Sequence, residues 1–434
     1  MDSNYLKITF TEQEQRDLNN NCINSFQYRS KPFINSDLYL TTIEDIKRLT
    51  TDTEVKTVYQ YDLSRKDIEY QFKPGDTIGI LPPNNEEEVN RLLLRLNYES
   101  QSHKIYKLTI LEQTTKKNPS IPKHVPENST LYSIFLNNID IRLPPKKVFL
   151  KSLIKYTTDT KELELLEKIC SSSSDYMEFL YSHKTLLSLF NAFPSCFPPV
   201  EIILQHSSPL HPRYFSIASS PLETDILSII FHVVEYDNGT KGVCTGWLDK
   251  LYKNQDIKNT KIPFYFRKSG DFNYTISTEP TVLIATGTGI VPFRSFLRHK
   301  ELIERNEEQS KSGDVLLYYG CRYQDRDFLL KEEIYNFIKN GTLTKLFTSF
   351  SRESTKKCYV QHELLKNGSE IVNLLLNKKA NLFICGNAKT TVKSVRETII
   401  ECFVLYGLMD KSSAEEQLTI LVKNKKFLVD NYWI

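Results

Sequence analysis

The C-terminal third of the sequence carries a turn that suits a bound phosphate. In "TVLIATGTGIVPFRSF" an apolar run leads into Gly287 and Gly289, and a helix is expected after Pro292. Glycines at such a turn let backbone N–H groups come close to a phosphate, and the N-terminus of the following helix favours negative charge. The pattern is GxGxxP rather than GxGxxG, and a turn of this kind by itself is as often structural as it is a binding site.

A second group of polar residues follows a later strand-like run. The stretch "TSFSRESTKKCYVQ" places Ser351 and Arg352 at the end of that run, with Lys357 shortly after. In an NAD site an acidic residue binds the ribose hydroxyls, whereas a Ser-Arg pair with a Lys supplies donors and charge for a 2′-phosphate. These residues favour NADP over NAD. The alternative is a solvated basic loop.

Two further residues pose a choice between packing and chemistry. Cys385 lies in "NLFICGNAK", where another strand is expected to end. A buried cysteine is usually a small core residue, but the carboxyl edge of a parallel sheet is where α/β folds bind ligands. Trp433 is the last residue but one of the sequence, and terminal residues fray unless the core or a ligand holds them.

Three styles of sequence are expected to position these residues. From about Lys31 to Pro83, short strand-like runs closed by "PGD" and "PPN" predict the start of an antiparallel barrel. From Glu86 to about Leu204, apolar residues at helical spacing predict a helical insert. Strand-like runs return at "YFSIASSPL", and from about Thr281 strands alternate with helices, which is the pattern of a parallel α/β sheet.

Composition limits the class of protein. The 434 residues include 56 Lys and Arg against 53 Asp and Glu, so the net charge of +3 gives no reason to expect nucleic acid as a partner. No apolar stretch reaches the roughly 18 residues that span a bilayer, and the N-terminal residues lack a signal-peptide core, which predicts a cytoplasmic protein without a membrane partner. The eight cysteines stand singly, so neither a metal site nor a disulfide is expected.

Seven motifs occur in the order found in one protein family. They are "RYFSIASS", "GVCTGW", "TGTGIVPF", "YYGCRYQDRDF", "SFSRESTKKCYVQ", "FICGNAK" and the near-terminal tryptophan. Together they resemble the FAD- and NADPH-binding half of the diflavin reductases, in the ferredoxin-NADP reductase superfamily. Within that family, "PKKVFLKSLIKYT", "AFPSCFPP" and "GVCTGWL" are most similar to the methionine synthase reductases. The resemblance covers about residues 30–434 and implies an NADPH-dependent flavoprotein oxidoreductase.

The resemblance also implies a fold. It is an α+β multidomain architecture in which an antiparallel FAD-binding β-barrel with a helical connecting insert precedes a Rossmann-like parallel α/β domain that binds NADP. The expected divisions are an N-terminal extension at 1–30, the barrel at 31–85 and 206–276, the insert at 86–205 and the NADPH-binding domain at 277–434.

Site residues carry over from the family motif by motif. For FAD the resemblance implies that the flavin and its phosphates are held by Arg213, Tyr214, Phe215 and Ser216, and that the adenine stacks on Tyr236. It places the pyrophosphate against Gly242, Val243, Cys244 and Thr245, and the indole of Trp433 against the flavin. For NADPH it implies Gly287, Thr288, Gly289, Arg322, Ser351, Arg352, Lys357, Tyr359 and Gln361. Ser216, Cys385 and Trp433 are expected around the point of hydride transfer, where nicotinamide and flavin must stack closely without water.

Four positions depart from the family pattern. Phe215 replaces the tyrosine expected beside the flavin, Asn387 the aspartate of "CGD", and Ser394 a further aspartate. Asn431 stands where an acidic residue is expected two positions before the terminal tryptophan. Together these changes are expected to remove negative charge from the hydride-transfer and cofactor sites, which affects catalytic competence more than binding.

The family begins with a flavodoxin-like FMN domain, whereas only about 30 residues precede the barrel here. The sequence is therefore interpreted as a single-flavin module. It is expected to take hydride from NADPH and to pass electrons to a separate FMN or flavodoxin-like protein, or to methionine synthase. Two alternatives stay open: a reductase for another haem or iron–sulfur acceptor, and a non-catalytic binding or chaperone module that keeps the flavoprotein fold.

Overall fold

The computed structural model describes residues 4–14, 26–255, 260–306, 312–355 and 357–432. The chain divides into two compact units. One comprises Met1–Phe33 and Leu81–Arg213, and the other Ile34–Ile80 and Tyr214–Ile434.

The first unit is mainly helical. Its helices are α1 (Glu86–Arg95), α2 (Leu131–Asn137), α3 (Lys147–Leu153), α4 (Thr160–Ser171), α5 (Ser173–Ser182), α6 (Leu186–Ala192) and α7 (Val200–His206). It also holds a small antiparallel sheet in the order β1 (Leu6–Glu14), β5 (Lys104–Ile110), β6 (Asn128–Thr130). The N-terminal extension thus pairs through β1 with a strand of the insert, a pairing that was not predicted from the sequence.

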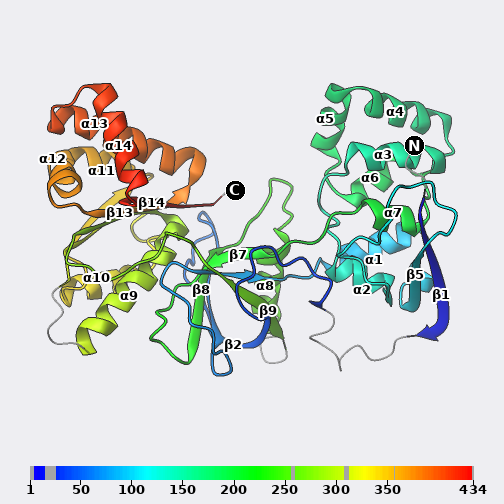
Figure 1. Ribbon diagram of the computed structural model, residues 1–434, viewed down its shortest axis with the longest axis horizontal. Helices are drawn as coiled ribbons and strands as arrows, with labels where there is room; N and C mark the ends of the chain where they lie inside the picture. The colour runs from blue at the N-terminus through cyan, green and yellow to red at the C-terminus, as the bar shows by residue number, and fades with distance from the viewer. Residues whose placement is uncertain (1–3, 15–25, 256–259, 307–311, 356, 433–434) are drawn as a thin grey trace. The chain divides into compact units, whose positions relative to one another are not determined.

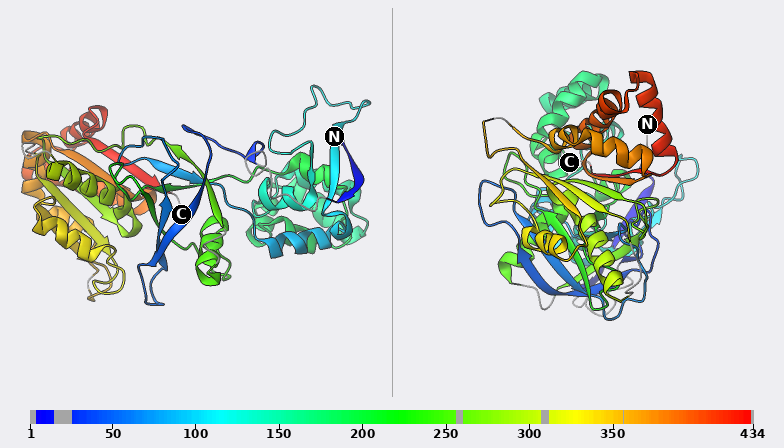
Figure 2. Two further views of the ribbon diagram at one scale, coloured as in Figure 1. Left: turned by 90° about the horizontal axis from the view of Figure 1, so that it is seen from below. Right: turned by 90° about the vertical axis from the view of Figure 1, so that its left-hand side faces the viewer.

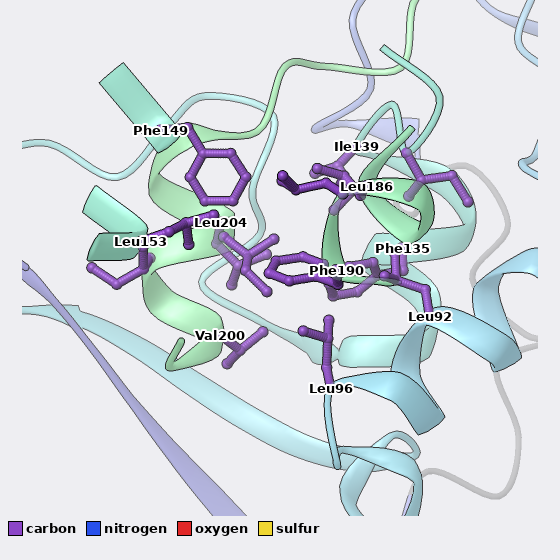
Figure 3. Close-up of a cluster of buried hydrophobic side chains, with 14 of the residues drawn as sticks. Leu92, Leu96, Phe135, Ile139, Phe149, Leu153, Leu186, Phe190, Val200 and Leu204 are labelled. Atoms are coloured by element: carbon purple, nitrogen blue, oxygen red, sulfur yellow. The ribbon is translucent and has the colours of Figure 1, made fainter. Parts of the chain in front are cut away.

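Apolar side chains at helical spacing form the core of this unit. Leu92 of α1, Leu96 just after that helix, Phe135 of α2 and Phe190 of α6 point into one cluster (Figure 3) and are at most 4% exposed. Helix ends are set by local caps, as at α6, where Thr185 forms a capping box with Ser188. The insert therefore carries a hydrophobic core of its own.

The second unit begins with an antiparallel barrel. Its six strands follow the order β7 (Arg213–Ser216), β4 (Thr77–Ile80), β9 (Lys261–Arg267), β2 (Tyr39–Arg48), β3 (Val58–Ser64), β8 (Ile226–His232). A bridge between Ile217 and Ile229 connects the two ends of this order and closes the sheet. Helix α8 (Val243–Asn254) packs Leu248 and Leu251 into the barrel core.

A parallel sheet follows the barrel in the same unit. Its order is β12 (Lys345–Phe350), β11 (Val315–Cys321), β10 (Thr281–Thr286), β13 (Asn381–Asn387), β14 (Phe427–Tyr432), and every neighbouring pair is parallel. The edge strand β14 is drawn in red in Figure 2. Together with the barrel and the helical insert, this sheet confirms the α+β multidomain fold expected from the sequence.

Helices cover both faces of the parallel sheet (Figure 1). One face packs on α9 (Val291–Asn306) and α10 (Lys331–Lys339). The other packs on α11 (Val360–Lys366), α12 (Gly368–Val372), α13 (Lys393–Gly407) and α14 (Lys411–Lys423). Continuous apolar runs such as "TVLIA" form the strands because both of their faces are buried.

No helix in the described part of the chain is long and apolar enough to cross a membrane. Within the same residues, no group of three His, Cys, Asp or Glu side chains is arranged to hold a metal ion. None of the described cysteines forms a disulfide.

Candidate functional site

A cavity of about 640 Å³ lies at the carboxyl edge of the parallel sheet, where residues at the ends of β10, β11, β12 and β13 line its wall. This edge is where open α/β sheets bind ligands. Six of the nine residues predicted for NADPH line the cavity: Gly287, Thr288, Arg322, Ser351, Tyr359 and Gln361. The structure thus brings together residues that are up to 74 positions apart in the sequence (287 to 361).

The two glycines of the predicted phosphate turn have different roles. Gly287 has a φ of +53°, in the left-handed region that side chains other than glycine rarely adopt. At Gly289 an added Cβ would overlap with the carbonyl oxygen of Cys385, so this glycine lets the turn lie directly against β13. Gly289 therefore faces β13 rather than the cavity wall, and Thr288 between the two glycines faces the cavity.

Backbone hydrogen bonds hold the loops that follow β11 and β12 beside one another. The N–H of Ser351 donates to the carbonyl of Cys321 at 3.0 Å, and the N–H of Arg352 donates to the carbonyl of Arg322 at 2.9 Å. The carboxylate of Asp327 in turn accepts from the N–H of Arg322 at 3.1 Å. Arg352 and Lys357 are exposed and lie outside the cavity lining.

Two polar barrel residues also line the cavity, and neither was predicted from the sequence. Lys56 precedes β3 and His232 ends β8. Nζ of Lys56 lies 3.3 Å from Nε2 of His232, and Oγ1 of Thr288 lies 3.5 Å from Nδ1 of the same ring. Burial and the nearby Arg322 lower the pKa of Lys56. Two cations thus face one cavity, which favours an anionic ligand, and no local motif marks the barrel residues that contribute.

The imidazole of His232 links this site to acid stability. Burial, with Lys56 nearby, lowers the pKa of His232 from 6.5 to about 4. Between these values the unfolded chain binds a proton that the folded chain does not, so the contribution of His232 to stability is full above about pH 6.5 and is lost as the pH falls toward 4. We expect the free energy of unfolding of a His232→Asn variant to fall about 2 kcal/mol less than that of the wild type between pH 7 and pH 5.

Urea unfolding at the two pH values measures this difference directly. Acidic residues contribute equally in both proteins, so they cancel in the comparison. An equal loss of stability in the variant and the wild type would show that His232 titrates as it does in the unfolded chain.

Ser216 and Cys385, predicted to meet at the reacting ends of the cofactors, contact one carboxylate. Oδ2 of Asp430 lies 3.5 Å from Oγ of Ser216 and 3.9 Å from Sγ of Cys385. The parallel register of β13 and β14 places Cys385 directly opposite Asp430. Burial raises the pKa of the Cys385 thiol well above its usual value, so the sulfur keeps its proton and acts as a hydrogen-bond donor rather than as a nucleophile.

Asp430 corrects an expectation drawn from the sequence. The acidic residue was expected at position 431, and the presence of Asn431 implied that negative charge is lost at this place. In the structure Asp430 supplies the carboxyl group, so the expected loss of this acidic group is wrong here. The acid stands three residues before Trp433 instead of two, a shift that the family's fixed spacing could not detect. Trp433 itself lies outside the described residues.

Burial also raises the pKa of Asp430, while Arg267, Ser216 and Cys385 oppose that rise. The carboxylate thus depends on its three neighbours to remain charged, because burial favours the neutral acid. The other two departures in this region, Asn387 and Ser394, both lie on the cavity wall. Asn387 caps the turn after β13 by accepting from the N–H of Lys389 at 2.9 Å, a role that needs an oxygen but no charge.

Strand β7 carries the first residues predicted for FAD. The guanidinium of Arg267 lies 4.5 Å from the centre of the Tyr214 ring. The side chain of Arg213 is 39% exposed and lies 3.9 Å from the Asp140 carboxylate. Phe215 is 9% exposed and belongs to the hydrophobic core of the barrel. Arg213 and Tyr214 are thus less buried than Phe215, whose ring serves packing.

The start of α8 fits a phosphate group. The helix follows Gly242 with no side-chain cap, which leaves its first turn without the usual capping oxygen. Cys244 is 2% exposed, and Oγ1 of Thr245 accepts a hydrogen bond from the N–H of Val234 at 3.1 Å, so these side chains serve packing. Tyr236, which precedes the turn, is 55% exposed, as expected of a ring that stacks on a ligand.

Comparison with known proteins agrees with this geometry. A family model described as "FAD binding domain" matches residues 31–247, and one described as "Oxidoreductase NAD-binding domain" matches residues 283–397. The chain belongs to the FAD binding domain family and carries the oxidoreductase NAD-binding domain after it. The predicted cofactors, FAD and NADPH, are confirmed, and the domains are those of a flavoprotein oxidoreductase.

Relatives that are similar over most of this chain include two kinds of reductase. The chain is 34% identical over 425 residues to methionine synthase reductase of Rattus norvegicus and 32% identical over 423 residues to that of Homo sapiens, which covers 91% of this chain in each case. It is 28% identical over 419 residues, or 94% of the chain, to NADPH--cytochrome P450 reductase of Cavia porcellus. The chain spans 61% of the first two relatives' length and 60% of the third's.

Proposed function

We propose that this chain takes hydride from NADPH onto FAD and passes electrons on to an FMN or flavodoxin-type protein, or to the cobalamin enzyme methionine synthase. Its role is then the reductive reactivation of methionine synthase in methionine biosynthesis. The observation that carries the proposal is the cavity, because its wall combines the glycine turn, Ser351 and two cations, Lys56 of the barrel and Arg322 at the end of β11. The similarity to methionine synthase reductases supports the choice of acceptor.

Charged and hydroxyl groups support the proposed position of NADPH. Gly287 and Thr288 at the start of the turn, with Lys56 from the barrel, suit the pyrophosphate. Ser351, Arg352 and Lys357 follow β12, where hydroxyl and cationic groups suit the 2′-phosphate. Three further cavity residues offer a cation, a ring and an amide to the adenosine: Arg322, Tyr359 and Gln361.

The hydrogen bonds of Asp430 support the proposed point of hydride transfer. FAD, when bound, supplies the ring that accepts the hydride. The thiol of Cys385 and the hydroxyl of Ser216 both point at the Asp430 carboxyl group, which fixes their positions. Because Gly289 packs against the Cys385 carbonyl, the turn that anchors the pyrophosphate is tied directly to the strand that carries the thiol. Such a fixed wall suits the close alignment that hydride transfer needs.

The decisive experiment is anaerobic mixing of the FAD-loaded protein with NADPH. We expect the yellow absorbance of the flavin to bleach rapidly with NADPH and slowly with NADH. A protein that does not retain FAD, or whose flavin stays oxidised, would contradict the proposal and favour the non-catalytic module. NADPH consumption with a flavodoxin-type FMN protein, with methionine synthase and with a haem protein then identifies the acceptor.

A second candidate is a reductase that serves a haem acceptor. The similarity to NADPH--cytochrome P450 reductase supports it, and the site chemistry is the same up to the reduced flavin. The non-catalytic alternative is opposed by the contacts of Ser216 and Cys385 with Asp430, which a pure binding module does not require. A cytoplasmic location remains part of this proposal.

A further inference from the structure

Ser349 is a buried hydroxyl with no partner at the wall of the cavity. It lies on β12, is 2% exposed, and its Oγ makes no hydrogen bond in the structure. It also lines the cavity at the carboxyl edge of the sheet. Buried polar groups are nearly always paired, so an unpaired one at a cavity wall points to a ligand that completes it.

The surroundings keep space open around this hydroxyl. Thr286, Gly320 and Ser349 lie in one row across β10, β11 and β12, because the parallel register pairs them in that order. A Cβ on Gly320 would come within 2.8 Å of Cγ1 of Val360 and 3.0 Å of Oγ of Ser349. A side chain at position 320 would therefore crowd the hydroxyl. Oγ1 of Thr286, at the other end of the row, is 3.0 Å from Oγ1 of Thr391.

The topology indicates which part of the coenzyme reaches this row. β10 leads into the proposed pyrophosphate turn at Gly287, and β12 leads into the proposed 2′-phosphate residues Ser351 and Arg352. In NADPH the adenosine ribose connects these two phosphate groups. The ribose must therefore cross the end of β11, which lies between β10 and β12 in the sheet.

We propose that Ser349 binds the 3′-hydroxyl of the adenosine ribose at this point. The inference rests on the proposed NADPH site and adds a contact to it. The 3′-hydroxyl is present in NADP and NAD alike, so Ser349 contributes to the affinity of both and does not select between them. The preference for NADP over NAD is assigned to Arg352 and its neighbours.

The test compares two variants that each delete one unpartnered buried hydroxyl. Tyr318 on β11 is 0% exposed, its hydroxyl has no partner, and it does not line the cavity. In the FAD-loaded protein we expect Ser349→Ala to weaken both NADP⁺ and NAD⁺ by about 3- to 10-fold, the range of a neutral hydrogen bond. Tyr318→Phe should leave both affinities unchanged. Neither variant should lower the melting temperature of the coenzyme-free protein.

A coenzyme built on 3′-deoxyadenosine identifies the contact. This coenzyme lacks the 3′-hydroxyl that Ser349 is proposed to bind. It should therefore bind the wild type and Ser349→Ala with equal affinity. Calorimetric titration gives the dissociation constants, and thermal melting without coenzyme gives the structural control.

Each contrary result has its own meaning. Unchanged affinity of Ser349→Ala for both coenzymes overturns the inference, and weakened NADP⁺ alone moves the contact to the 2′-phosphate and overturns the ribose assignment. A lower melting temperature in Ser349→Ala alone shows that the hydroxyl has a structural partner. Failure of the wild type to bind NADP⁺ refutes the proposed function itself, independently of Ser349.

Discussion

Replacing Cys385 by alanine is expected to slow the reduction of bound FAD by NADPH about a hundredfold, while FAD content and fold stay intact. Hydride transfer needs close alignment of the two rings, and a small misplacement of a reacting group has an effect of about that size. The Cys385 thiol is held at the Asp430 carboxyl group, 3.9 Å from Oδ2, and keeps its proton. Stopped-flow measurement of a single turnover gives the rate.

The control is a second buried cysteine away from the site. Cys402 lies on α13, is 0% exposed and belongs to the hydrophobic core on that face of the sheet, so Cys402→Ala makes the same chemical change in the core alone. We expect it to lower stability and to leave flavin reduction unchanged. Asp430→Asn should slow reduction as well, because it removes the charge that orients Cys385 and Ser216. An unaltered single-turnover rate in Cys385→Ala would assign the thiol to packing.

Replacing Arg352 by alanine is expected to weaken NADPH by about 10- to 150-fold and NADH very little. Loss of a charge-assisted hydrogen bond to a phosphate removes about 1.5 to 3 kcal/mol of binding free energy. NADH lacks the 2′-phosphate and cannot lose that contact. Arg352 is exposed, and its N–H is bonded to the carbonyl of Arg322, so the variant should keep the loop in place through the backbone. The ratio of kcat/KM for the two coenzymes measures the effect.

Arg305→Ala is the matched control. Arg305 lies in the last turn of α9 in the same unit, its side chain is 58% exposed, and it pairs with Glu301 away from the cavity. It should leave the ratio of the two coenzymes unchanged. Similar losses for NADPH and NADH in Arg352→Ala would rule out the 2′-phosphate role and restore the solvated-loop interpretation.

Local sequence patterns predicted most of the elements. The apolar runs "TVLIA", "DVLLYYG" and "NLFICG" became β10, β11 and β13 because parallel strands are buried on both faces and need no alternation. The glycine turn was also predictable, since Gly287 takes a left-handed conformation that other residues adopt only with strain. The pairing of β1 with β5 was not, because strand partners far apart in the chain leave no local signal.

The sequence by itself determined which chemistry could be predicted: residue types at fixed spacing within one motif favour phosphate binding and NADP over NAD. Only the tertiary structure decided which residues from distant parts of the sequence lie together at the site. Lys56 and His232 reach the cavity through the register of barrel strands, and Asp430 reaches Cys385 through the register of β13 and β14. A parallel register is set by packing of whole strands on both faces of a sheet, so Asp430 meets Cys385 through the pairing of β13 and β14 and not through its spacing from Trp433 in the sequence.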